Sequence, residues 1–208
     1  MRRFLAAQFL PVLRAWRNGY EAEVRRCVIA FFILIFLAFG VCLTVPEVRI
    51  GFSAYLRNLY QGMDLTDETG ALSPLPLFLN NLRACGVTML YGLIPFVRLP
   101  ALALGLNAML LGGLAAVYAA ADRTMLLFAA ALLPHGIFEL PAMILSFAMG
   151  LYVCGHLTRR CRHDGAALSL GQCAALAART LVFLVLPLLI LAAVTEAYVT
   201  PVVIGLFL

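Results

Sequence analysis

The stretch CVIAFFILIFLAFGVCLTV, residues 27–45, decides the fold of this chain. None of its side chains is charged. Crossing the hydrocarbon core of a bilayer takes roughly 20 apolar residues in a helix, so this stretch predicts a transmembrane helix. The apolar residues run continuously and do not alternate with polar ones, which favours a helix over a strand of a membrane β-barrel.

The rest of the chain has the same character. Of the 208 residues, 64% are hydrophobic, and the mean hydropathy is +1.00. A soluble protein of this length could not bury that much apolar surface. The expected spans are 27–45, 76–97, 100–121, one within 124–158, and 180–206. We therefore expect an all-α polytopic membrane bundle of about five spans within the lipid bilayer, with residues 1–26 as a cytoplasmic amphipathic segment and 27–208 as the transmembrane domain.

The basic residues predict the orientation. All fifteen are arginine. If the spans alternate in direction, eleven of them share one side: Arg2, Arg3, Arg14, Arg17, Arg25, Arg26, Arg98, Arg159, Arg160, Arg162 and Arg179. The other side receives only Arg49, Arg57 and Arg123, and Arg83 lies within the expected second span. Basic loops favour the cytoplasm, so the N-terminus is expected inside and the C-terminus outside the bacterial inner membrane. Arginines scattered along membrane edges do not form a nucleic-acid-binding surface.

Two amphipathic pieces flank the first span. In 4–20, apolar residues recur at helical spacing at Leu5, Phe9, Leu13, Trp16 and Tyr20. This pattern fits a helix on the cytoplasmic membrane surface or one packed on other spans. The extracytoplasmic loop 46–75 has a comparable pattern at Val48, Phe52, Tyr55, Leu56 and Leu59, followed by an acidic tip with Asp64, Asp67 and Glu68. The second piece is either a plain surface loop or a contact surface for an extracytoplasmic partner.

The apolar run 124–158 is too long for one ordinary crossing and contains the sequence PHGIFELP, 134–141. Pro134 and Gly136 disfavour a continuous helix. We expect an interruption within two or three residues of Pro134–Gly136. Residues 124–133 would then form a short half-helix that re-enters the outer leaflet or lies on it, and Glu139 would lie near the outer boundary of the fourth span.

Ionisable residues are rare inside membrane segments and point to function. His135 and Glu139 are four residues apart, which places them on one face of a helix. Glu196 in the last span falls at a similar expected depth. The second span adds a group of polar residues at its outer end, namely Asn80, Asn81 and Arg83. These six residues predict one polar cluster in the outer half of the membrane.

The cluster allows three interpretations. It could be a structural lock, in which Arg83 pairs with Glu139 or Glu196 and His135 bonds a backbone carbonyl. It could line a water-filled cavity of a transporter, or a site that binds an ion or a lipid headgroup. His135, Glu139 and Glu196 could also ligate a divalent metal such as zinc with one position open, as in an intramembrane metal-dependent hydrolase. No other enzyme signature accompanies them, so the sequence does not favour catalysis.

Three stretches resemble the stage II sporulation protein M family of integral membrane proteins. They are LLPHGIFELPAMILSFAMG (132–150), AAVTEAYVTP (192–201) and FLNNLRACG (78–86), and the resemblance covers about 76–208. It implies a non-enzymatic membrane anchor or scaffold that works with peptidoglycan-remodelling partners of the cell envelope. Self-association into a homo-oligomer stays open.

Overall fold

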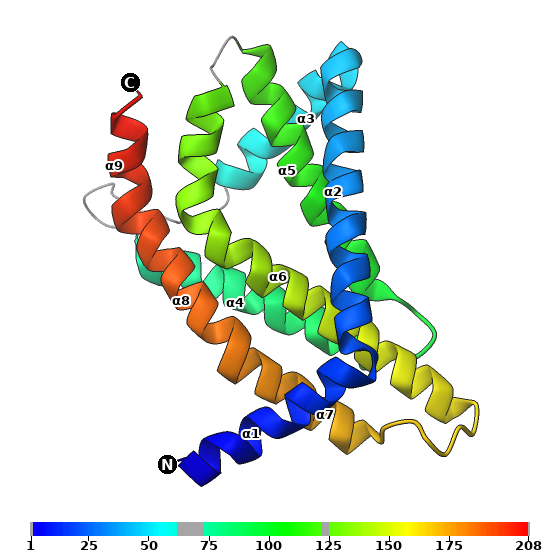
Figure 1. Ribbon diagram of the computed structural model, residues 1–208. Helices are drawn as coiled ribbons and strands as arrows, with labels where there is room; N and C mark the ends of the chain where they lie inside the picture. The colour runs from blue at the N-terminus through cyan, green and yellow to red at the C-terminus, as the bar shows by residue number, and fades with distance from the viewer. Residues whose placement is uncertain (1, 62–72, 122–124, 208) are drawn as a thin grey trace. The chain divides into compact units, whose positions relative to one another are not determined.

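The computed structural model describes residues 2–61, 73–121 and 125–207, and every regular element within them is a helix (Figure 1). The elements are α1 Arg2–Ala15, η1 Trp16–Tyr20, α2 Glu21–Thr44, α3 Pro46–Gln61, α4 Pro74–Tyr91, α5 Leu99–Ala120, α6 Met125–Cys161, α7 Leu170–Thr180, η2 Leu181–Val185, α8 Leu186–Val194, η3 Thr195–Val199 and α9 Thr200–Gly205. The all-α prediction is confirmed. The acidic tip with Asp64, Asp67 and Glu68, as well as Arg123, lies outside the described residues.

Four helical stretches of the described chain are long and apolar enough to cross a membrane: Ala7–Thr44, Leu99–Ala120, Met125–Cys161 and Leu170–Gly205. The chain is therefore a membrane protein. The prediction of about five spans is consistent with these four stretches together with α4. Helix α4 has 18 residues and includes Asn80, Asn81 and Arg83, which lower its apolar character. Its crossing of the bilayer stays a prediction.

The expected interruption at Pro134–Gly136 is wrong. Helix α6 is continuous over 37 residues, through both Pro134 and Pro141. A helix end in lipid leaves several backbone groups without partners, whereas a proline removes one N–H donor. Continuity therefore costs less than a re-entrant break. At 1.5 Å per residue, Glu139 lies about 21 Å from the first residue of a helix about 55 Å long, so Glu139 belongs to the interior of α6.

The last helical stretch contains two widened π-turns, each placed before a proline. In η2 the N–H of Leu186 donates to the carbonyl of Leu181, one residue before Pro187. In η3 the N–H of Thr200 donates to the carbonyl of Thr195, one residue before Pro201. Proline has no N–H to donate. The hydrogen bond from the backbone N–H of the residue before each proline therefore maintains the helix. Single π-turns of this kind occur frequently at functional sites.

The chain divides into two compact units, the first made of Met1–Ile29, Asn81–Leu104 and Leu140–Leu189. Its N-terminal helix α1 lies beside α7 and the following η2 (Figure 1). Arg179 Nε of α7 donates to Gln8 Oε1 at 3.1 Å, and the ring of Phe183 in η2 is 5.6 Å from that of Phe9. Helix α1, which covers most of the amphipathic segment 4–20, thus packs on another helix, as one of the two alternatives proposed. The segment bends at Asn18 and Gly19, whose backbone angles are not helical.

Close backbone approach organises the interior of the first unit. A Cβ atom added to Gly92 would overlap the backbone of Gly150, and one added to Gly150 would lie 2.7 Å from Cγ of Pro100. Glycine at both positions lets the end of α4 contact α6 directly, as small residues do between membrane helices. Nearby, the fully buried Tyr20 donates its hydroxyl to the carbonyl of Leu145 at 2.9 Å.

The second unit consists of Ala30–Asn80, Gly105–Glu139 and Ile190–Leu208. Within it, α3 lies against α5, because a Cβ on Gly113 would overlap the ring of Phe52. Leu56, one turn further along α3, is buried. The amphipathic pattern of 46–61 is therefore a helix with one face packed on a membrane helix and the other face exposed.

Candidate polar site within the membrane helices

The structure brings together His135, Glu139 and Glu196, which all belong to the second unit. One ligand atom from each residue lies within 4.8 Å of the other two. The continuous α6 places His135 one turn before Glu139, with Nε2 of the histidine 3.9 Å from Oε2 of the glutamate. Glu196 comes from the π-turn η3. Within the described residues, no other group of three or more residues drawn from His, Cys, Asp and Glu has the geometry to bind a metal ion.

Thr200 orients the histidine ring. Its hydroxyl lies 3.3 Å from His135 Nδ1 and itself donates to the carbonyl of Thr195, also at 3.3 Å. A hydroxyl has one hydrogen, so with that hydrogen on Thr195 the Thr200 oxygen can only accept from His135. We assign the hydrogen of a neutral ring to Nδ1 on this network. The lone pair of Nε2 then faces the carboxylate of Glu139.

This arrangement places three electron-rich groups next to one another. The side chains of His135 and Glu139 are 13% and 21% exposed. Within the described residues of the second unit, no arginine makes a hydrogen bond or ion pair to either glutamate. Carboxylates withdrawn from water are costly unless a cation or a proton compensates their charge. The geometry therefore suits a positively charged occupant.

The other three predicted members lie elsewhere along the chain. Asn80 is exposed and is the last residue of α4 that belongs to the second unit. Asn81 and Arg83 belong to the first unit, where Arg83 is exposed. Pairing of Arg83 with a glutamate stays a prediction. The expected carbonyl partner of His135 is replaced by the hydroxyl of Thr200.

Sequence reasoning missed Thr195 and Thr200. Both stand in TEAYVTP, 195–201, five residues apart. In an ideal α-helix that spacing does not bring the two residues to one point on the helix surface. The signal that could have identified them is Pro201, because a proline inside an apolar helix favours a locally widened turn just before it.

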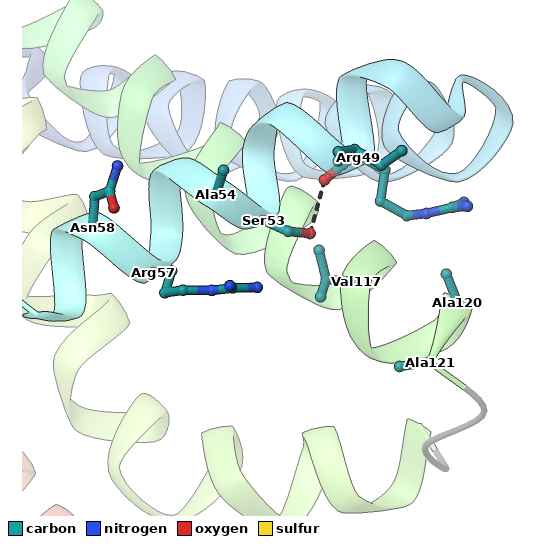
Figure 2. Close-up of a pocket in the computed structure, with 9 residues that line it drawn as sticks. Arg49, Ser53, Ala54, Arg57, Asn58, Val117, Ala120 and Ala121 are labelled. Atoms are coloured by element: carbon teal, nitrogen blue, oxygen red, sulfur yellow. Dashed lines mark hydrogen bonds between the residues drawn. The ribbon is translucent and has the colours of Figure 1, made fainter.

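A second polar feature of the same unit is a pocket of about 600 Å³ between α3 and the end of α5 (Figure 2). Its lining residues are Arg49, Ile50, Ser53, Ala54, Arg57, Asn58, Val117, Ala120 and Ala121. The Arg49 guanidinium donates to the carbonyl of Leu43, and the Ser53 hydroxyl donates to the carbonyl of Arg49. Arg57 makes no ion pair within the described residues. Two guanidinium groups beside apolar walls suit an anionic group carried on an apolar body.

Comparison with known proteins assigns the chain to a family. The search of curated proteins and the search of solved structures each returned no match. The sequence model described as stage II sporulation protein M matches residues 28–201, which include most of the helical chain and all of the His135–Glu139–Glu196 group. The resemblance of the three quoted stretches is thus confirmed over a longer range than they span. A match over this much of the sequence shows that the chain belongs to the stage II sporulation protein M family.

Proposed function

We propose that this protein is an integral scaffold of the bacterial inner membrane that positions peptidoglycan-remodelling partners on the outer side. The single observation that carries the proposal is that α3 packs one face on a membrane helix and leaves the other face exposed. Phe52 packs this helix against Gly113 of α5 and Leu56 is buried, whereas Ile50 and Tyr55 of the same helix are exposed. Family membership supports the scaffold role through the function that the resemblance implies.

The exposed face of α3 has the composition of a protein contact surface. Ile50 is 69% exposed and Tyr55 is 52% exposed, and Ile50 lines the pocket together with Arg57 and Asn58 of the same helix. Figure 2 shows Arg57 and Asn58 at this pocket. Interfaces between proteins are enriched in aromatic residues and arginine. The basic groups select a partner that presents carboxylate side chains near an apolar patch.

The arginine distribution supports the placement of α3 on the outer side of the membrane. With the N-terminus inside, α3 follows the first span and therefore lies outside, where peptidoglycan is located. The same orientation places Arg159 and Arg160 at the end of α6 in the cytoplasm. The C-terminal α9 then ends on the outer side.

Photo-crosslinking in the native host tests the scaffold. A photoreactive residue replacing Tyr55 should capture a secreted or membrane-anchored cell-wall-remodelling protein, and Arg57→Glu should reduce this adduct at least about tenfold by reversing one charge of the contact. The protein level, measured by immunoblot, should be unchanged because Arg57 is exposed.

The control places the same photoreactive residue at Tyr91, which is 41% exposed at the end of α4. Tyr91 should not give the same protein adduct. Adducts to phospholipid alone at position 55 would overturn the scaffold proposal and favour a lipid-headgroup site in the α3 pocket instead.

A further inference from the structure

We propose that His135, Glu139 and Glu196 bind one divalent transition-metal ion inside the membrane helices, with the metal joining α6 to the π-turn η3. This inference goes beyond the scaffold function and does not depend on it. The three ligand atoms are one nitrogen and two carboxylate oxygens within 4.8 Å of one another. One imidazole with two carboxylates is a ligand set that zinc and neighbouring divalent metals accept.

The histidine carries the strongest argument. Because the Thr200 hydroxyl already donates to Thr195, it receives the Nδ1 hydrogen of His135 and leaves Nε2 as an acceptor. Nε2 then faces Oε2 of Glu139 at 3.9 Å. Two acceptors facing each other at this distance repel unless a proton or a metal cation lies between them. A metal ion supplies that charge to both atoms at once.

Thr200 has the role that an outer-shell partner has in established metal sites. Metal-ligating histidines usually give their second ring N–H to a neighbouring acceptor, which fixes the tautomer and the direction of the ring. Thr200 is 5% exposed, and its own hydrogen bond to the π-turn holds it in place. The widened turn thus positions both Glu196 and the group that aims His135.

The spacing requires a small closure on binding. Ligand atoms about 2.0–2.1 Å from a tetrahedral zinc ion are about 3.3 Å apart, somewhat less than the 4.8 Å limit of this group. Rotation of the two glutamate side chains can provide the difference. Three protein ligands would leave one coordination position for water or another small ligand.

The test uses the full-length protein, purified in detergent and stripped with chelator, with Zn²⁺ as the probe. The parent should bind one Zn²⁺ per chain and gain thermal stability from it. Glu139→Gln and Glu196→Gln should each weaken Zn²⁺ binding at least 100-fold. Thr200→Val should weaken it about 10- to 100-fold, as expected for an outer-shell partner. The matched control Glu47→Gln, an exposed glutamate in α3, should bind Zn²⁺ like the parent.

Co²⁺ substitution of the parent gives a second measurement that needs no variant. Its visible spectrum should show nitrogen and oxygen ligands without sulfur charge-transfer bands, which excludes binding through the exposed Cys161. Sulfur bands, no stoichiometric Zn²⁺ uptake by the parent, or equal uptake by the parent and Glu196→Gln would each overturn the proposal. Low yields of the glutamate variants would leave the spectrum of the parent and the Thr200→Val titration to decide.

Discussion

Tyr20 allows the contribution of one buried hydroxyl to the stability of this fold to be measured. The centroids of the Trp16 and Tyr152 rings lie 5.6 and 5.9 Å from that of Tyr20, and the Tyr20 hydroxyl donates to the carbonyl of Leu145. Tyr20→Phe keeps the ring contacts and removes only the hydrogen bond. We expect a loss of about 0.5–1.5 kcal/mol in the free energy of unfolding, measured by thermal unfolding of the purified protein in detergent.

Tyr55→Phe is the matched control for this prediction. Tyr55 is 52% exposed, so loss of its hydroxyl should change stability by less than about 0.5 kcal/mol. If the two variants unfold at the same temperature, the bond from Tyr20 to Leu145 does not contribute to stability.

Helix α6 carries two glycines five residues apart whose substitution should have opposite effects. A Cβ on Gly150 would lie 2.7 Å from Pro100 Cγ and 2.9 Å from the carbonyl oxygen of Thr88. Gly150→Ala should therefore destabilise the protein by about 1–3 kcal/mol through overpacking. A Cβ on Gly155 would meet no atom within 4 Å. Gly155→Ala should stabilise the helix by up to about 1 kcal/mol, because alanine has the higher helix propensity.

Denaturation of both variants in the same detergent checks the difference in sign. Destabilisation by Gly155→Ala as well would mean that helix packing at Gly150 is not the cause. Stabilisation by both would mean that α6 is not in close contact with Pro100 and the end of α4.

For the whole molecule, the arginine distribution predicts a membrane topology. Labelling of native and introduced cysteines can test this topology. Cys161 is exposed at the end of α6 and should react with a membrane-impermeant maleimide only after the cells are permeabilised. In a Cys161→Ser background, Asn58→Cys on the exposed face of α3 should react in intact cells. This difference follows from an N-terminus inside and an odd number of crossings before the C-terminus.

The buried cysteines Cys27, Cys42, Cys85, Cys154 and Cys173 serve as the internal control, since they should stay unlabelled in the folded protein. Equal labelling of Cys161 and of Asn58→Cys in intact cells would contradict the orientation. Labelling of both only after permeabilisation would show that α3 lies in the cytoplasm.

The amino-acid sequence by itself determined the fold class, the family and three residues of the polar site, His135, Glu139 and Glu196. Apolar runs such as 27–45 leave no soluble alternative, because their surface cannot be buried in water. The i, i+4 spacing of His135 and Glu139 follows from helix geometry alone. Glu196 was identified because a carboxylate within an apolar span is costly and therefore unusual.

Only the tertiary structure decided that α6 continues through Pro134 and that Thr200 aims His135. The local preference of Pro134 and Gly136 favours a break, but the cost of unpaired backbone groups in lipid exceeds it. The contact between Thr200 and His135 joins residues 65 apart and depends on the π-turn before Pro201. No periodicity in the sequence encodes that turn, because it adds one residue to the helical repeat where two packed helices meet.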